Sequence, residues 1–325
     1  MIKQFIKSLL GEKNTQRVIR LKSSVEAAKS AWRSFGNTQP EKSSLTTSLL
    51  ISVHMLEKAS VIGNVKYLGA VKYNDLINKI SCLIEMGVPP EDFSIAESVA
   101  VIKSTLALLS GHEDAKSQLE ALISKHNIPL NLKGGSEKIP SAEILKHINF
   151  DFHGFVSSRH SVRKFKDTII SREKIYDIVR DASYYPSACN RQPCKVYFSE
   201  DREKIADIIK LGADGFLAAG IHDCLIVTCD RALLSPRELD DQEYINGGIF
   251  LGYLVMSIHA HGLGACLFQC TRASIGKQDR IRRRFGISGS EVIVCCIGIG
   301  ELEDEVSCAC AQRRPVETVA VNLDS

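Results

Sequence analysis

The chain has 325 residues, enough for one large domain or two modest ones and for a core that needs no covalent staples. Its net charge of +3 is too small to indicate nucleic-acid binding, and 44% hydrophobic with 24% charged residues is ordinary for a globular protein. No apolar run is long enough to predict a transmembrane helix, and residues 1–10 are too short and polar for a secretory signal. Those residues read as a short basic amphipathic helix or as a solvated helical end, and we expect a cytoplasmic protein.

Residues 1–130 are predicted to be a helical N-terminal region, and residues 131–150 a linker. The helical pattern comes from apolar residues at helical spacing, closed by glycines, over residues 49–56, 73–86, 89–109 and 114–125. The linker contains Gly134-Gly135-Ser136, which interrupts that pattern.

In residues 151–325 helices and short apolar runs alternate, which predicts an α/β or α+β layer structure. Helices are expected over residues 171–184, 201–211, 242–261 and 274–285, the first capped by Ser171. Strands are expected over residues 195–199, 224–229, 265–268 and 291–298.

The eleven cysteines are an odd number, and most lie inside apolar runs such as DCLIVTC and VIVCCIGIG. They read as small buried hydrophobic side chains in a reducing compartment. No pair has zinc-type spacing with a partner pair, so we predict no metal site.

Two segments carry polar groups suited to a ligand. Ser158 to Phe165, SRHSVRKF, places two arginines around a hydroxyl and an imidazole; it suits an anion such as phosphate, or is a solvated basic face. Tyr185 to Pro193, YPSACNRQP, is bracketed by prolines and suits a flat heteroaromatic ring, or is an ordinary turn.

Two later segments add glycines and a second basic cluster. In HGLGACLFQ, residues 261–269, a helix ends at glycines and a strand follows, the reverse of a dinucleotide-binding fingerprint. In residues 297–300 a strand ends in Gly-Ile-Gly, and QRRPVE follows at 312–317.

The order of these four segments, over residues 152–319, resembles the nitroreductase family of flavin enzymes. The resemblance implies an α+β fold with a nitroreductase-like mixed sheet flanked by helices, preceded here by the helical region. It implies FMN as cofactor, NADH or NADPH as co-substrate, and a homodimer whose two flavin sites lie at the interface. The apolar helix over residues 242–261 is suited to such an interface.

The family pattern also implies roles for individual residues. Arg159, His160 and Ser161 correspond to the positions that hold the flavin phosphate and one ring edge, with Arg163 either in the same role or in a structural ion pair. A loop that lies against the ring, usually from the partner subunit, corresponds to Pro186, Ser187, Ala188, Asn190 and Gln192. The backbone after Gly264, at Gln269, approaches the reactive edge, and Arg313, or Arg314 one residue on, is the second phosphate ligand.

The chain departs from the family at two places. The family often has an aromatic residue after Gln-Pro, where this chain has Cys194, and the segment from 216 to 242, which forms a lid in many relatives, is short. Cys189 would lie close to the flavin, as a redox group or as a spectator thiol. No side chain is identified as an obligate catalytic acid or base.

The segment His54-Met55-Leu56-Glu57-Lys58 resembles an H-x-x-E-K segment of nitroreductase-like proteins associated with capsular or extracellular polysaccharide biosynthesis; otherwise it is a helix with an exposed Glu-Lys pair. The prediction is an FMN-dependent oxidoreductase reducing a small organic acceptor, without nucleic-acid partners. Two alternatives stay open: a regulatory flavin-binding protein that has lost turnover, and a relative that fragments or dehydrogenates its substrate.

Overall fold

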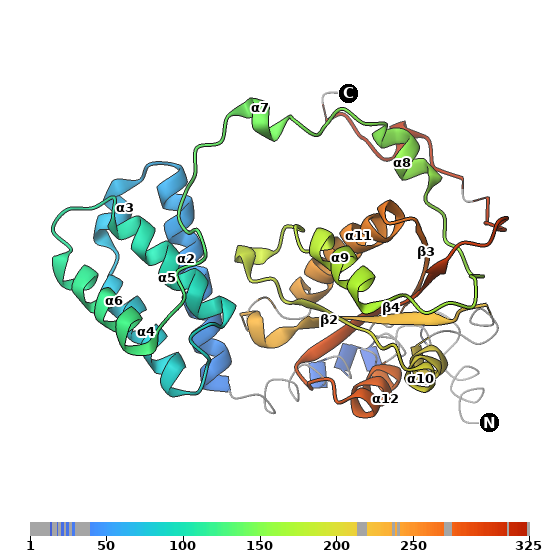
Figure 1. Ribbon diagram of the computed structural model, residues 1–325, viewed down its shortest axis with the longest axis horizontal. Helices are drawn as coiled ribbons and strands as arrows, with labels where there is room; N and C mark the ends of the chain where they lie inside the picture. The colour runs from blue at the N-terminus through green and yellow to red at the C-terminus, as the bar shows by residue number, and fades with distance from the viewer. Residues whose placement is uncertain are drawn as a thin grey trace.

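The computed structural model describes residues 40–212, 220–235, 238, 241–269, 275–310 and 312–323, with scattered positions between 14 and 29. The prediction for residues 1–10 lies outside this part of the chain. Figure 1 shows a cluster of helices beside a sheet that carries helices above and below it.

The helical region, residues 40–128, has its own core. It consists of helices α2 (Pro40–Val61), α3 (Val65–Ala70), α4 (Tyr73–Glu85), α5 (Phe93–Leu106) and α6 (Glu113–His126). One continuous cluster of buried apolar side chains, among them Ile80, Leu83, Ile95 and Val99, joins these helices. Asp92 caps α5 by accepting a hydrogen bond from the Ser94 amide at 2.9 Å. The predicted helices of this region are therefore confirmed, with α3 added.

Residues 129–150 connect the helical region to the sheet and run over the top of the molecule in Figure 1. Apart from α7 (Ser141–Ile144) they contain no helix or strand. Their apolar side chains are exposed, including Ile144 at 66% and Ile148 at 62%. The chain then enters α8 (Phe152–Ser158).

The described residues of the sheet region, 151–323, form four strands in the order β1-β2-β4-β3: β1 (Cys194–Tyr197), β2 (Asp223–Asp230), β3 (Leu263–Gln269) and β4 (Glu291–Glu301). All three strand pairs are antiparallel. Parallel pairing among the described residues is limited to two isolated bridges, Ser161 with Ala265 and Lys164 with Gly220. The α+β class is confirmed, and the mixed character of the sheet rests on those bridges.

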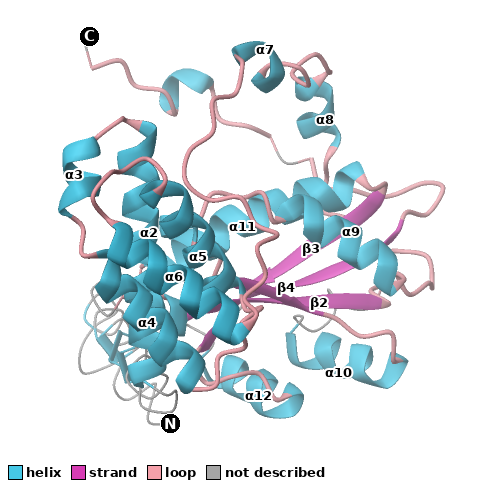
Figure 2. Ribbon diagram, turned by 60° about the vertical axis from the view of Figure 1, so that its left-hand side comes forward, coloured by secondary structure: helices cyan, strands magenta, loops and turns pink. Residues whose placement is uncertain are grey.

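Helices cover both faces of this sheet. Helices α9 (Arg172–Ala182) and α11 (Gln242–Ala260) lie on one face, and α10 (Arg202–Gly212) and α12 (Ile275–Phe285) on the other. Figure 2 shows the same two layers from the side. Along β2, Leu225 and Val227 enter the first core and Cys224 and Ile226 the second, which is the alternation expected of a strand. Because both faces are buried, β2 and β4 are continuous apolar runs rather than alternating ones.

The prediction that most cysteines are buried like small hydrophobic side chains is confirmed for four of them. Cys224, Cys229, Cys295 and Cys296 are each at most 3% exposed. The predicted Ser171 cap also holds, because its hydroxyl accepts from the Lys174 amide at 3.3 Å.

Helix α11 is seated closely on β4. A Cβ atom at Gly247 would lie 2.6 Å from a methyl carbon of Val294, so only glycine lets the helix approach this near. The predicted helix over residues 242–261 is thus confirmed, and its buried side includes Phe250, Leu254 and Ile258.

The helical region touches the sheet region through α2. The Thr47 hydroxyl donates to the carbonyl of Ala232 at 3.1 Å, and α2 packs against the short 3-10 helices η1 (Ala188–Asn190) and η3 (Arg231–Leu233). Leu50 is buried yet outside the core of the helical region, as expected for a residue one turn beyond Thr47 on this contact face. The helical region therefore supports the proline-bracketed loop.

Candidate functional site

Two of the predicted ligand segments lie side by side. The segment that begins at Arg159 leaves α8 and runs along β3, where Ser161 forms a parallel bridge with Ala265. The Val162 amide donates to the Ala265 carbonyl at 3.1 Å. Arg159, His160 and Ser161 are thereby brought next to Gly264, about a hundred residues further along the chain.

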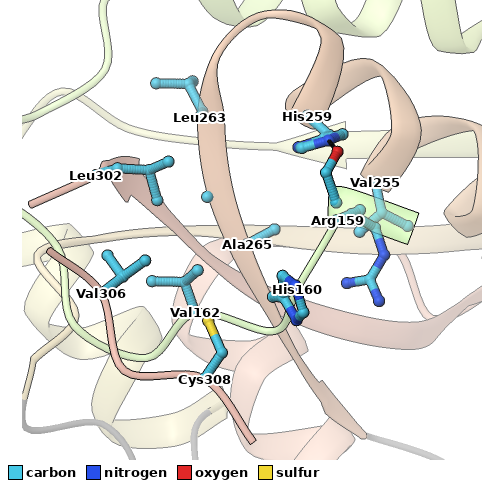
Figure 3. Close-up of a pocket in the computed structure, with 12 residues that line it drawn as sticks. Arg159, His160, Val162, Val255, His259, Leu263, Ala265, Leu302, Val306 and Cys308 are labelled. Carbon is cyan, nitrogen blue, oxygen red and sulfur yellow. Dashed lines mark hydrogen bonds between the residues drawn. The ribbon is translucent and has the colours of Figure 1, made fainter. Parts of the chain in front are cut away.

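A pocket of about 70 Å³ opens where these segments meet. Figure 3 shows Arg159, His160 and His259 around one hollow, with side chains of the segment after β4 on its other side. The complete lining is Ser158, Arg159, His160, Val162, Val255, His259, Leu263, Gly264, Ala265, Leu302, Val306 and Cys308. One guanidinium and two imidazoles around a largely apolar floor suit an anion attached to an apolar group.

His259 is a pocket residue that the sequence reasoning missed. The Ser158 hydroxyl and the His259 Nε2 are 2.9 Å apart, and the His259 ring lies 5.1 Å from that of Phe155. These contacts hold the end of α11 against α8 and fix one side of the pocket. Its place one turn before Gly262 at the end of a long apolar helix was the available signal.

The pocket tests whether the residues present fit FMN. A volume of about 70 Å³ is well below the roughly 300–1,000 Å³ of pockets that hold a ligand of this size. Arg159 and His160 fit a phosphate or one polar edge of the ring system. The residues around the pocket therefore fit part of the group, and the remainder of the site must come from elsewhere.

The second ligand segment lies at the other end of α11. The amide of Ala188 donates to the Asn246 Oδ1 at 3.0 Å, so the proline-bracketed loop is tied to the first turns of α11. The pocket around Arg159 is lined by Val255 and His259 from the last turns of the same helix. Because His259 lies thirteen positions after Asn246, the two are about 20 Å apart along the helix, at about 1.5 Å per residue.

The loop is built with an unusual backbone. Cys189, Asn190 and Gln192 have φ angles of 50°, 50° and 48°, in the left-handed region that non-glycine residues rarely adopt. Such strain persists only where surrounding contacts enforce it, and it gathers at functional sites. Contacts around this loop must therefore hold its backbone in place.

Arg191 supplies much of that enforcement. Its guanidinium is 2% exposed and donates to both carboxylate oxygens of Glu238 at 2.8 Å, to the Leu233 carbonyl at 3.0 Å and to the Ala188 carbonyl at 2.9 Å. The hydrogen bonds from Arg191 lower the pKa of Glu238. Sequence reasoning did not single out Arg191, because two of its partners, Leu233 and Glu238, lie more than forty residues away.

The loop's own polar side chains point to one another and to solvent. The Gln192 amide group donates to the Asn190 Oδ1 at 3.2 Å, and the Gln192 backbone amide to the Ser187 hydroxyl at 3.1 Å. Pro186 and Asn190 are exposed, while Ser187 and Ala188 are half-buried. The loop thus has a surface free to meet a ligand.

Asn246 carries an unmatched donor beneath this loop. It is 1% exposed, and its Nδ2 has no hydrogen-bond partner among the described residues. An unmade hydrogen bond of a buried group costs about 1–3 kcal/mol, which functional sites tolerate. The donor marks the loop as a place where a polar acceptor is missing.

The remaining predicted residues are placed less closely. Gly264 is buried, and a Cβ there would lie 2.7 Å from Leu302 and 2.9 Å from Phe165, so this glycine is required by packing within the chain. Gln269 ends β3 opposite Cys295, and its side chain lies outside the described residues. Exposed Arg163 donates to the Ser161 carbonyl at 3.4 Å.

Arg313 and Arg314 are exposed in the segment after β4, and neither lines the pocket that contains Arg159. The two arginine clusters are therefore not joined by that pocket.

The described helices include none that is both long and apolar enough to cross a membrane.

Comparisons with known proteins agree with the sequence pattern. Residues 156–228 match the model of the Nitroreductase family. No curated protein is significantly similar to the chain in sequence.

Solved structures similar to this chain include an FMN-dependent nitroreductase from Clostridium difficile, 22% identical, with a TM-score of 0.42 over 49% of this chain and 91% of that one. A putative nitroreductase in complex with FMN from Desulfovibrio desulfuricans is 18% identical, with a TM-score of 0.46 over 54% and 97%. A putative NADH oxidase from Clostridium acetobutylicum is 18% identical, with a TM-score of 0.44 over 51% and 98%.

Proposed function

We propose that this chain, whose sheet region is of the nitroreductase family, is a homodimeric FMN-dependent oxidoreductase that uses NADH or NADPH to reduce a small organic acceptor. One observation carries the proposal: the phosphate-binding segment and the ring-binding loop lie at opposite ends of α11. About 20 Å of helix separates the two segments within one chain, whereas in the family that the sequence resembles the ring-binding loop usually comes from the partner subunit. A second chain with its α11 antiparallel to the first would bring them together.

The outer face of α11 suits that arrangement. Ile245, Ile249 and Tyr253 are 51%, 37% and 44% exposed, and their spacing of four residues places them on one face. Gly248 and Gly252 lie between them, with open space where a side chain would project. A self-complementary apolar face of this kind is what a two-fold dimer interface requires.

Bound FMN would supply the acceptor and donor of the hydride. On this proposal Arg159, His160 and Ser161 hold the phosphate and one ring edge, with Arg313 or Arg314 as the second phosphate ligand. The guanidinium and imidazole groups around the pocket would also stabilise negative charge on the reduced ring. The backbone from Gly264 to Gln269 would face the reactive edge. The loop 186–192 of the partner subunit would cover the ring.

The test is an FMN titration of the full chain, followed by absorbance and fluorescence. We expect a yellow protein with one FMN per chain, and Arg159→Ala should weaken FMN binding about 10–100-fold, since a charge-assisted hydrogen bond contributes about 1.5–3 kcal/mol. Arg172→Ala is the control, because this exposed arginine pairs with Glu200 at 3.1 Å outside the pocket. A colourless protein that ignores FMN contradicts the proposal.

Turnover distinguishes the two alternative functions. Bleaching of the flavin by NADH or NADPH and its return on addition of a quinone or nitroaromatic would support reduction of an organic acceptor. A flavin that neither nucleotide reduces would favour a regulatory protein, and flavin breakdown products under air would favour a fragmenting enzyme.

The organisation of the chain is part of the proposal: residues 1–130 form a helical domain, 131–150 a linker and 151–325 the flavin domain. The separate core of the helical region supports this division. A cytoplasmic location is supported by the cysteines that are buried among apolar side chains, a role that suits a reducing compartment.

A role in polysaccharide biosynthesis rests on His54 and Glu57. The His54 Nδ1 lies 3.0 Å from a Glu57 carboxylate oxygen, and both side chains are about one-fifth exposed. A partly buried pair of this kind is available to a polar ligand at the outer face of α2. Calorimetry with nucleotide sugars, comparing the wild type with His54→Ala, tests this role. If neither protein gives a heat of binding, the role is contradicted.

A further inference from the structure

Two cysteines face each other across neighbouring strands. Cys194 begins β1 and is the direct partner of Cys229 in β2. The adjacent pair, Pro193 and Asp230, is hydrogen-bonded, because the Asp230 amide donates to the Pro193 carbonyl at 2.8 Å. Hydrogen-bonded and non-hydrogen-bonded pairs alternate along an antiparallel ladder, so Cys194 and Cys229 occupy a non-hydrogen-bonded pair.

That position has the geometry of a disulfide. Opposite residues in a non-hydrogen-bonded pair have Cα atoms about 4.5 Å apart and their side chains closest together. A disulfide bridges Cα atoms about 4.4–6.8 Å apart. The backbone of the sheet therefore brings these two cysteines within bonding range without any rearrangement.

The two thiols differ in exposure and in acidity. Cys194 is half-buried and free, while Cys229 is free and fully buried. A hydrogen bond from the Cys229 thiol lowers the pKa of Cys194, and the same contact together with burial raises the pKa of Cys229. Cys194 is thus the group that reagents reach and that ionises first, while Cys229 keeps its proton.

We propose that Cys194 and Cys229 form a peroxide-reactive dithiol site that closes into a cross-strand disulfide. The Cys194 thiolate attacks one oxygen of hydrogen peroxide, which gives a sulfenic acid at Cys194 and releases hydroxide. The Cys229 thiol then attacks the sulfenic sulfur, the S–S bond forms and the sulfenic oxygen leaves as water. Hydroxide takes up the remaining proton, so two thiols and one peroxide give one disulfide and two waters.

The site lies at the foot of the strained loop. Cys194 follows Pro193, the last residue of the segment that contains the three left-handed residues. Cys229 precedes Asp230, which leads into η3, and α2 packs on η3 and on the loop. The disulfide would therefore join the loop to the neighbouring turn and hold both against the helical region.

The first experiment uses the purified wild-type chain. It is treated with hydrogen peroxide, its remaining thiols are alkylated, and it is digested without reduction for mass spectrometry. We expect a peptide pair linked through Cys194 and Cys229, the loss of two titratable thiols per chain, and full recovery of both with dithiothreitol. A rise in Tm on oxidation is also expected, since the bond closes a long loop.

Variants separate this reaction from nonspecific oxidation. In Cys229→Ala, Cys194 should accumulate as a sulfenic acid that dimedone traps, whereas Cys194→Ser should give neither product. Cys82→Ser, at an exposed cysteine of the helical region, should behave as the wild type. Linkage of Cys194 to another cysteine, or unlinked Cys194 in the oxidised wild type, would overturn the proposal even if the variants failed to fold.

Discussion

In the helical region the apolar side chains of five helices converge on one core, whereas in the sheet region the apolar cores lie beside a pocket and the proline-bracketed loop. The sheet region exposes an apolar face on α11, holds three non-glycine residues at positive φ, and buries the unmatched donor of Asn246. Two of these three features lie at the same loop. The difference is consistent with the proposal that the sheet region is completed by a second chain and a cofactor, while the core of the helical region closes within one chain.

The largest effect is expected from a charge on the exposed apolar face of α11. We expect Ile249→Asp to give a monomer by light scattering at micromolar concentration, because a charge would be buried against the same face of the second copy. FMN affinity should fall at least about 100-fold with it, since each site would lose its ring-binding loop.

The control for this variant is Ile62→Asp, at an apolar residue of the helical region that is 74% exposed. It should remain a dimer with unchanged FMN affinity. A dimer that survives Ile249→Asp, or one that dissociates equally in Ile62→Asp, would place the interface elsewhere.

The self-sufficiency of the helical region is tested at its core. Ile80 is fully buried there, and Ile80→Ala should reduce the free energy of unfolding by about 2–5 kcal/mol. Urea unfolding followed by circular dichroism measures the loss. FMN affinity of the folded variant should stay within about twofold of the wild type, and a large loss of affinity would show that the two regions do not act separately.

Loss of the Asn246 side chain should have a smaller effect. Asn246→Ala removes the acceptor of the Ala188 amide, at a cost of about 1–2 kcal/mol, and should raise hydrogen exchange across residues 187–192. Ser257→Ala is the matched control: its buried hydroxyl, also on α11, donates to the Ile178 carbonyl at 2.9 Å, away from the loop. Equal exchange in the loop of both variants would show that Asn246 does not hold it.

Much of the fold was predictable because local pattern and tertiary burial agree. The runs around Cys224 and Cys295 read as buried strands, and they are buried since both faces of the sheet are covered. Helix α8 was missed because its seven residues are too few to show a helical period, and Phe152, its first apolar residue, is 62% exposed.

The site was predictable in its parts and not in its assembly. Residue types alone indicated the segments at Arg159 and at Ala188 as candidates for binding a ligand. Nothing in the spacing gives the bridge from Ser161 to Ala265, because long-range pairing depends on the register of the whole sheet. The contact of Arg191 with Glu238 is hidden for the same reason. Which segments meet, and that two of them do not meet within one chain, required the structure.

The last and smallest expected effect is the response of the sheet region to acid through Asp223. Asp223, in β2, is 2% exposed, and burial raises its pKa to about 6 although the amides of Ile170 and Cys224 donate to its carboxylate. In the unfolded chain the pKa is about 3.9, so the folded state binds the proton more tightly. The stabilisation from protonating Asp223 is therefore fully present below about pH 4 and is lost as the pH rises through 6.

Linkage between these two pKa values gives about 1 kcal/mol of added stability at pH 5 relative to pH 7. Asp223→Asn cannot take up this proton, so its stability should change less than that of the wild type between the two pH values. Urea unfolding of both proteins at pH 5 and pH 7 measures the difference, and other titrating groups cancel in it. Identical pH dependence in the two proteins would contradict the prediction. It would mean that the ionisation of Asp223 does not change the stability of the sheet region between pH 5 and pH 7.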